Sequence, residues 1–282
     1  MNPSVAAVGA GFQRGWIEFR QTVTNAGQAV GWLFLPVVGL VVMYLLRGTP
    51  VPGTDFSLGA RAIPGILGFS VVMTGLMGLA LALTMDREDG TLLRAKATPN
   101  GMLGYVTGKV VSQAGMTIGV LIIVLIPAAL LFQGLQLDRA SSWLNLAWVL
   151  ALGLVATLPI GAMLGSLFPN TQGLSFLSLL VMGLVMISGV FYPITGFPGW
   201  LQWVAQVFPL YWLGLGMRWA LLPDALSAAE LGGSWRQLEM VAVLGAWAVF
   251  GFVTAPIVLR RMARRESGSR VAARKDKAIQ QW

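Results

Sequence analysis

Charged side chains gather in one short stretch between two long apolar segments. The stretch from Thr84 to Lys109 reads TMDREDGTLLRAKATPNGMLGYVTGK and is the most densely charged part of the chain between its two ends. Acidic and basic groups at this density can pair with opposite charges on a partner, and such pairs fix register more than they add affinity. These residues therefore predict recognition of a partner in water.

The composition argues against most chemistry of active sites. The chain contains no cysteine and no histidine, so thiolate and imidazole metal ligands and the commonest general base are missing. The nearest approach to a phosphate-binding loop, Gly104 to Val110, has one residue too few between its glycines and no hydroxyl after Lys109. We expect no catalytic residue, no metal site and no cofactor bound by this chain.

The elements that position the charged stretch are apolar and long. The chain has 282 residues, 56% hydrophobic and 11% charged, whereas charged residues make up about 25% of a soluble domain. A membrane-spanning helix needs about 20 apolar residues. Six stretches without Asp, Glu, Lys or Arg qualify, at about 29–46, 62–84, 110–132, 143–168, 171–193 and 240–259. The sequence predicts a single all-α integral membrane domain, 1–282, with six transmembrane helices.

The six predicted spans contain no ionisable acid or base. Such residues are costly in a membrane and mark ion and proton paths, so their absence disfavours an ion-coupled secondary carrier. Pairs of glycines four residues apart allow close helix approach, although a chain with 35 glycines contains many such pairs by chance. The pairs are Gly104 and Gly108, Gly115 and Gly119, and Gly161 and Gly165.

The distribution of cations predicts the orientation. With both termini in the cytoplasm, 14 of the 19 lysines and arginines lie inside and five outside, as the positive-inside rule requires. The basic tail, 260–282, is then expected to be attracted to anionic lipid. The net charge of +8 has this explanation, and we expect no nucleic-acid partner.

Two segments outside the spans are apolar without being able to cross. Residues 12–28 place aromatic and aliphatic side chains on one side of a helix, which predicts an amphipathic helix in the inner interface. These side chains are Phe12, Trp16, Phe19 and Val23. The segment 194–239 predicts two short helices, about 198–207 and 210–222, that dip into the outer leaflet. Its aromatic rings either anchor the protein there or contact a substrate.

The charged stretch itself predicts a short helix. Gly90 ends the helix that descends from the second span, Thr91 caps a new helix, and Pro99 stops that helix. Leu92 and Leu93 offer an apolar face to a partner; alternatively, the stretch is only a solvated inner loop. The residues expected to dock the partner are Asp86, Arg87, Glu88, Asp89, Gly90, Thr91, Leu92, Leu93, Arg94, Thr98 and Pro99.

Two separated patterns resemble a known family. The first is an acidic-Gly-Thr and Thr-Pro signature after the second span, formed by Glu88, Gly90, Thr91, Thr98 and Pro99. The second follows the fifth span and comprises Ser188, Gly189, Phe191, Pro193, Pro198, Trp200, Leu201, Pro209, Leu210 and Arg218. With these patterns the chain resembles the membrane subunits of type 2 ABC exporters, and among them the daunorubicin-resistance-like permeases. Extra cations before Thr98-Pro99 leave the register of the docking helix open.

The resemblance implies a permease subunit of an exporter in a bacterial cytoplasmic membrane. It implies a dimer of permeases, identical or sister chains, with two cytosolic ATPase subunits that carry the ATP and Mg²⁺. The cargo is expected to be amphiphilic: a drug, antibiotic, lipid or glycolipid. A non-transporting scaffold or sensor is the other alternative.

The resemblance also frames two sets of site residues. An outer-leaflet set consists of Pro198, Trp200, Leu201, Pro209 and Arg218. A substrate path is expected along uncharged side chains, because methionine adapts to varied shapes; alternatively, these residues only face lipid or the core. The path set consists of Phe69, Met73, Met77, Phe176, Met182, Met186 and Phe191.

Overall fold

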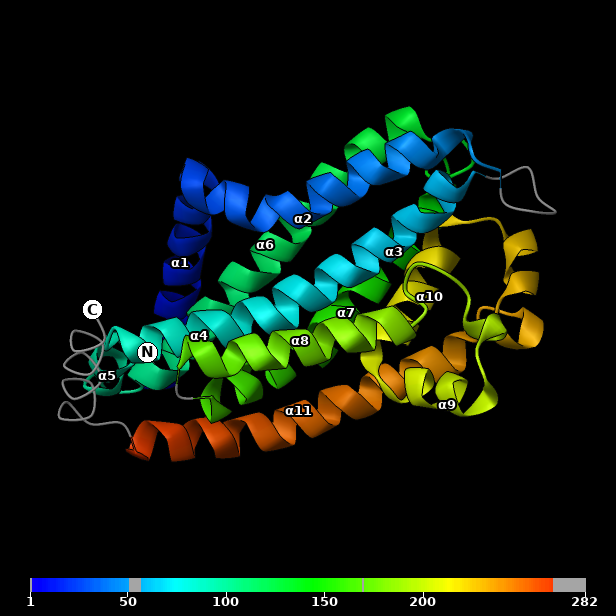
Figure 1. Ribbon diagram of the computed structural model, residues 1–282. Helices are drawn as coiled ribbons and strands as arrows, with labels where there is room; N and C mark the ends of the chain where they lie inside the picture. The colour runs from blue at the N-terminus through cyan, green and yellow to red at the C-terminus, as the bar shows by residue number, and fades with distance from the viewer. Residues whose placement is uncertain (1, 51–56, 169, 266–282) are drawn as a thin grey trace.

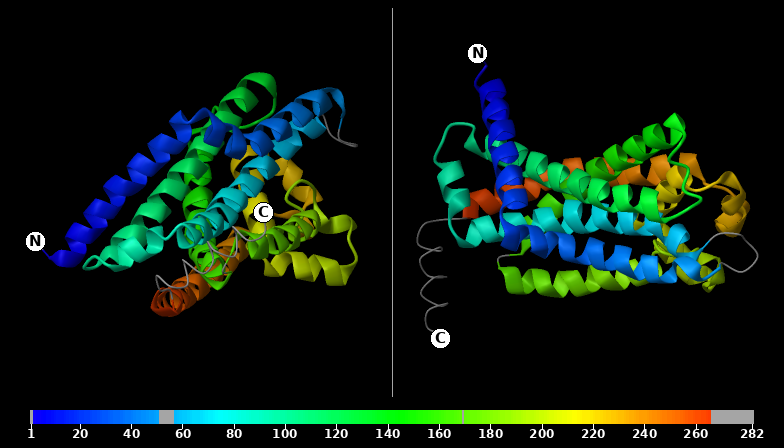
Figure 2. Two further views of the ribbon diagram at one scale, coloured as in Figure 1. Left: turned by 60° about the vertical axis from the view of Figure 1, so that its left-hand side comes forward. Right: turned by 90° about the horizontal axis from the view of Figure 1, so that it is seen from above.

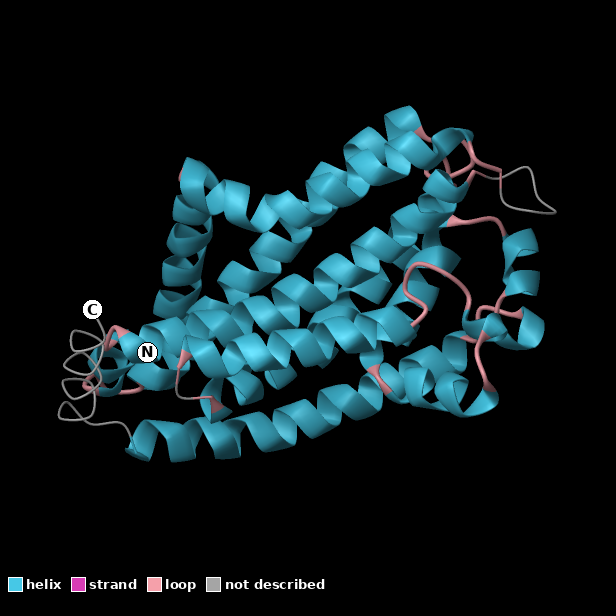
Figure 3. Cartoon of the chain, viewed as in Figure 1, coloured by secondary structure: helices cyan, strands magenta, loops and turns pink. Residues whose placement is uncertain are grey.

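The chain folds into a bundle of helices joined by short loops (Figures 1 and 3). The computed structural model describes residues 2–50, 57–168 and 170–265. These residues contain no β-strand, and one isolated bridge joins Pro50 to Ser57. The predicted all-α membrane fold is confirmed.

In chain order, the helices are α1 (Pro3–Thr24), α2 (Ala26–Leu45), α3 (Leu58–Val72), α4 (Leu79–Glu88), α5 (Thr91–Lys96), α6 (Gly101–Leu131), α7 (Ala140–Leu167), α8 (Thr171–Ile187), α9 (Gly199–Val207), α10 (Pro209–Leu221) and α11 (Gln237–Arg265). A π-helical stretch, η2 (Met73–Gly78), makes α3 and α4 continuous. Short 3₁₀ turns are η1 (Leu46–Gly48), η3 (Ile194–Gly196), η4 (Asp224–Ala229) and η5 (Leu231–Gly233).

Among the described residues, five helical segments are long and apolar enough to cross a membrane. They are Ala26–Gly48, Leu58–Glu88, Gly101–Leu131, Ala140–Leu167 and Gln237–Arg264. The fifth predicted span, 171–193, is shorter than expected: α8 has 17 residues, which reach about 25 Å across a hydrocarbon core of about 30 Å. It ends because Gly189 adopts φ +64°, a left-handed conformation that terminates helices.

The N-terminal helix also differs from its prediction. The expected helix, 12–28, begins nine residues earlier, at Pro3, and ends at Thr24. The break comes at Asn25, whose backbone is extended and whose side chain accepts the Gln28 N–H as the N-cap of α2. Residues after Asn25 therefore belong to the first span.

Glycines bring α1 directly against the first half of α6 (Figure 2). A Cβ atom added at Gly11 or Gly15 would overlap the carbonyl oxygen of Gly104 or Gly108, respectively. The two backbones can approach this closely only because these four positions lack side chains. The aromatic rings of Phe12 and Trp16 stay exposed, at 58% and 55%, so they are available to an interface.

The opposite ends of the bundle carry different elements. In Figure 1, α5 and the last turns of α11 lie at one end, and α9 and α10 lie at the other. At the second end, α10 is a core helix rather than a surface one, since Tyr211 and Trp212 are 0% and 2% exposed. Of the aromatic rings that were predicted to anchor the two short helices, Trp200 and Trp203 of α9 are exposed, at 68% and 75%.

Candidate docking site and its supporting ion network

The turn between α4 and α5 is defined by a left-handed glycine and two side-chain hydrogen bonds. Gly90 adopts φ 85° and ends α4, as predicted. Thr91 is the first residue of α5, and its N–H donates to Asp89 Oδ1 at 2.8 Å. Thr91 was predicted to be the N-cap, which is wrong: Gly90 occupies that position, and the side chain of Asp89 accepts the Thr91 N–H. The Thr91 hydroxyl instead accepts from Arg94 Nη2 at 3.0 Å.

The apolar side of α5 faces the protein. Leu92 is 1% exposed and Ala95 8%, and both belong to a buried cluster that contains Leu259 and Met262 of α11. Leu92 therefore anchors α5 to the bundle and does not present an apolar surface to a partner, contrary to expectation. The side chains between Asp86 and Pro99 that are exposed are Asp89, Arg94, Lys96, Ala97, Thr98 and Pro99.

Two charged residues at the end of α4 bind the neighbouring turn. Glu88 Oε1 accepts from the N–H of Thr171 at 2.9 Å and from its hydroxyl at 3.4 Å, where a carboxylate also complements the dipole at the start of α8. Arg87 Nη1 donates to the carbonyl oxygens of Ser166 and Phe168 at 3.5 and 3.4 Å. These charges hold α4 to the turn between α7 and α8.

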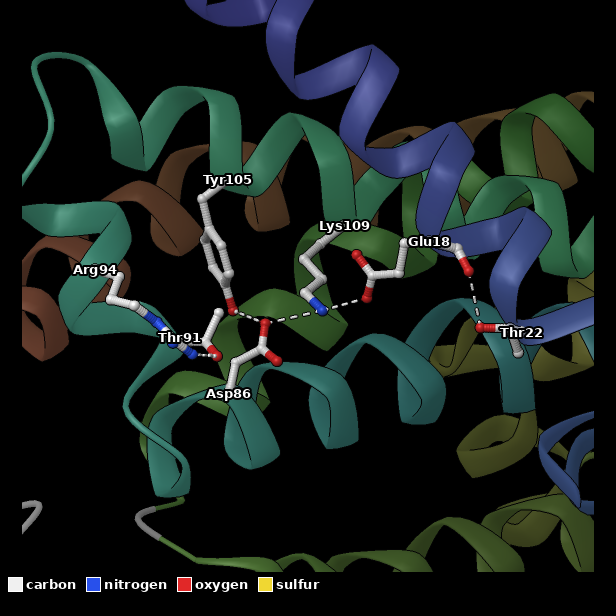
Figure 4. Close-up of polar contacts among 7 residues, drawn as sticks. All are labelled: Glu18, Thr22, Asp86, Thr91, Arg94, Tyr105 and Lys109. Atoms are coloured by element: carbon white, nitrogen blue, oxygen red, sulfur yellow. Dashed lines mark hydrogen bonds and ion pairs between the residues drawn. The ribbon is translucent and has the colours of Figure 1, made fainter. Parts of the chain in front are cut away.

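A buried cation joins three helices behind α5 (Figure 4). Lys109 of α6 forms ion pairs with Asp86 of α4, at 2.8 Å, and with Glu18 of α1. The Tyr105 hydroxyl donates to the same Asp86 oxygen at 2.8 Å. Side-chain exposure falls from 32% at Glu18 to 15% at Asp86 and 6% at Lys109. We call these four residues the ion network.

The ion network connects α1, α4 and α6 through the paired charges of Lys109. A buried ammonium group is tolerated when its charge is paired and its protons are hydrogen-bonded. Lys109 meets two carboxylates from two other helices, so α1, α4 and α6 cannot separate without exposing an unpaired charge to the interior. Arg14 of α1 adds a contact, with its guanidinium carbon 5.4 Å from the centre of the Tyr105 ring. The arrangement connects three helices through buried charges.

Asp86 and Lys109 stand out in the sequence as members of the charged stretch, whereas Glu18 and Tyr105 were not predicted. One signal was present: a lysine at the start of a long apolar helix needs a counter-charge, and Glu18 is the only acid among the first 54 residues. Nothing in the spacing indicated that Tyr105, one turn before Lys109, shares the acceptor.

The other end of the bundle has a second buried ion pair. Arg218 of α10 meets Glu230 through Nε at 2.9 Å and Nη2 at 3.2 Å, with both side chains at most 2% exposed. Its Nη1 donates to the carbonyl oxygens of Gly189 and Val190 at 3.1 and 3.0 Å. The contact with Glu230 comprises one hydrogen bond, from Nη2, and the ion-pair contact of Nε. Arg218 thus fixes the turn after α8; its partner Glu230 was not predicted.

The other outer-leaflet residues serve the two short helices. Pro198 immediately precedes α9 and Pro209 is the first residue of α10, where a proline costs no helical hydrogen bond. Trp200 and Leu201 lie in the first turn of α9.

The predicted path residues fall into separate groups. Phe69 of α3 and Phe191 are brought together, with ring centroids 5.9 Å apart. Met73 and Met77 are partly buried in η2. On α8, by contrast, the path residues are exposed: Phe176 at 75%, Met182 at 44% and Met186 at 63%. A continuous path through all seven stays a prediction.

A comparison with known families finds a match over most of the chain. A family model described as ABC-2 type transporter matches residues 10–222. The matched range includes the ion network, α5 and Arg218, and it ends before Glu230 and α11. No curated protein matches the chain.

Proposed function

The chain belongs to the ABC-2 type transporter family, and we propose that it is the permease subunit of an ATP-driven exporter whose ATPase is a separate protein. As a multi-pass membrane component it supplies the transport path and no catalytic group of its own. The ATPase binds ATP and Mg²⁺ and docks on α5 at the cytoplasmic face of a bacterial membrane.

This proposal rests on the contacts that hold α5 against the rest of the bundle. Its outer side carries the exposed charges of Asp89 and Arg94, while its inner side is fixed by Leu92 to the cluster that includes α11. The preceding helix, α4, is tied by Asp86 to Lys109 and through it to Glu18 of α1. A force applied to α5 is therefore passed to α4, α6, α1 and α11 together.

ATP binding is coupled to transport because the ATPase binds the two conformations of the permease with different affinity. A partner shifts a conformational equilibrium only by its different affinity for the two states. When two ATPase subunits close on ATP, each moves α5 and α4 of its permease, and the ion network carries α1 along. The helices tilt as a unit and open a path between two permeases toward the outside.

Two helices support a paired assembly. In α2, Pro36 is the one residue that is buried within the chain. On α8, Phe176 and Leu179 are 75% and 71% exposed. These apolar sides are available to a second permease, identical or a sister chain, and to lipid. The same exposed side of α8, lined by methionine and phenylalanine, suits an amphiphilic drug, antibiotic, lipid or glycolipid, since methionine adapts to varied shapes.

Binding of the ATPase tests the docking role directly. Purified protein in nanodiscs is titrated with its candidate ATPase subunit, and the variants Asp89→Lys and Arg94→Glu are compared with Arg139→Glu. Arg139 is an exposed cation that precedes α7, and it lies outside the cell in the proposed orientation. We expect docking-site variants to weaken binding by about tenfold and Arg139→Glu to leave it unchanged. Equal binding by all four proteins would refute docking on α5.

A further inference from the structure

The last turns of α11 carry a cationic hollow that the proposed function does not use. Ile257, Arg260, Arg261 and Arg264 line a surface hollow of about 220 Å³. All four are exposed, and at steps of three, one and three residues they lie on one side of the helix. We call this set the arginine hollow.

The charges of the arginine hollow have no internal counter-charge in the described part of the chain. No carboxylate there forms an ion pair with any of the three guanidinium groups. Arg260 and Arg264 are four residues apart and Arg261 and Arg264 three, spacings at which like charges repel. An anion held between the three side chains removes this repulsion and can accept several charge-assisted hydrogen bonds.

The same side of α11 is apolar immediately before the arginines. Phe250, Val253 and Ile257 recur at steps of three and four and are 46%, 60% and 49% exposed. From Phe250 to Ile257 this apolar stripe is about 10 Å long. A free phosphate or a nucleic acid makes no use of such a stripe, whereas a phospholipid combines an acyl chain with a charged phosphate in this order.

We propose that this side of α11 is a binding site for an anionic phospholipid. The phosphate group lies between Arg260, Arg261 and Arg264, and one acyl chain lies along Val253 and Phe250. The site is at the end of the bundle that carries α5 (Figure 1). It is more specific than a general attraction of the whole basic tail to a charged membrane surface, because it involves three named arginines on one side of α11.

The opposite side of α11 gives the bound lipid a consequence. Leu259 and Met262 are 8% and 3% exposed and belong to the buried cluster that holds Leu92 of α5. A lipid that steadies the end of α11 also steadies the surface on which α5 rests. Given the proposed function, anionic lipid should therefore strengthen docking of the ATPase.

Lipid binding is measured first, without any partner. Native mass spectrometry of the full-length protein, titrated with phosphatidylglycerol or phosphatidylcholine, compares the wild type with two variants. One is R260Q/R261Q/R264Q; the other, R270Q/R274Q/K275Q/K277Q, removes four cations of the tail as a control. We expect the first variant to bind phosphatidylglycerol at least about tenfold more weakly, with phosphatidylcholine binding unchanged and the tail variant like the wild type. A preference lost only in the tail variant overturns the proposal.

A competition arm separates the lipid from free phosphate. Inorganic phosphate at the same concentration should leave phosphatidylglycerol bound, because phosphate gains nothing from the apolar stripe. Displacement at equal concentration means that the hollow recognises any phosphate anion, and it overturns a lipid site.

A second arm adds the ATPase in nanodiscs of defined composition. Wild-type protein should bind it more tightly with phosphatidylglycerol than with phosphatidylcholine alone, and R260Q/R261Q/R264Q should lose this difference. If that variant weakens ATPase binding equally in both lipids, the arginines contact the ATPase directly and the proposed effect of the lipid on docking is overturned. If the wild type binds no ATPase in either lipid, the proposed function fails while the mass-spectrometric result still decides the lipid site.

Discussion

At the scale of single residues, the chain places its buried charges where helices must be held together. Lys109 joins three helices at one end, and Arg218 joins α10, Glu230 and the turn after α8 at the other. Removing one member of a buried ion pair is costly chiefly because it leaves the other charge unpaired. Substitutions at these positions therefore test connection between helices, not catalysis.

Replacing Lys109 by methionine should destabilise the protein by about 3 kcal/mol, because Asp86 then stays buried with an unpaired charge. Adding Asp86→Asn removes that charge, so the double variant should recover part of the loss. Thermal unfolding in one detergent measures both, with Arg20→Met as a control at an exposed position. A K109M protein as stable as the wild type would show that the ion network contributes nothing to stability.

At the scale of elements, close approach between helices depends on glycine at particular positions. α1 meets α6 at Gly11 and Gly15, whereas Phe12 and Trp16, which helped to make α1 recognisable in the sequence, are exposed. Phe19 is partly buried and lies against Gly115 of α6. The residues at the closest contact, Gly11 and Gly15, were therefore not the residues that formed the hydrophobic pattern in the sequence. Glycine pairs were too frequent in the sequence to choose among, and only the structure identifies Gly104 and Gly108 as the partners of α1.

The variant Gly11→Leu should separate α1 from α6, because its side chain has no space beside the carbonyl oxygen of Gly104. Overpacking of this kind costs about 1 to 3 kcal/mol. Gly9→Leu is the matched control, since a Cβ atom there meets nothing within 4 Å. Hydrogen exchange should show faster exchange of α1 amides in Gly11→Leu alone. Unchanged exchange in both variants would contradict the glycine contact.

At the scale of the whole molecule, hydropathy and cation counts predicted the class of fold, because a helix in lipid must be apolar along its length. They could not predict the burial of Leu92 or the end of α8 at Ile187. These features depend on contacts between distant segments: α11 covers α5, and Arg218 binds the turn that follows α8. Local signals were sufficient for Gly90 and Pro99, whose effects act within a few residues.

The orientation of the whole molecule can be tested with single cysteines, because the chain has none of its own. The cation asymmetry predicts that α5 lies in the cytoplasm and the loop after α10 lies outside. Ala97 and Ala228 are exposed in these two regions. In intact cells a membrane-impermeant maleimide should label Ala228→Cys and not Ala97→Cys, and permeabilisation should make both reactive. The reverse pattern would place α5 outside the cell, where no ATPase could reach it, and would contradict both the orientation and the docking site.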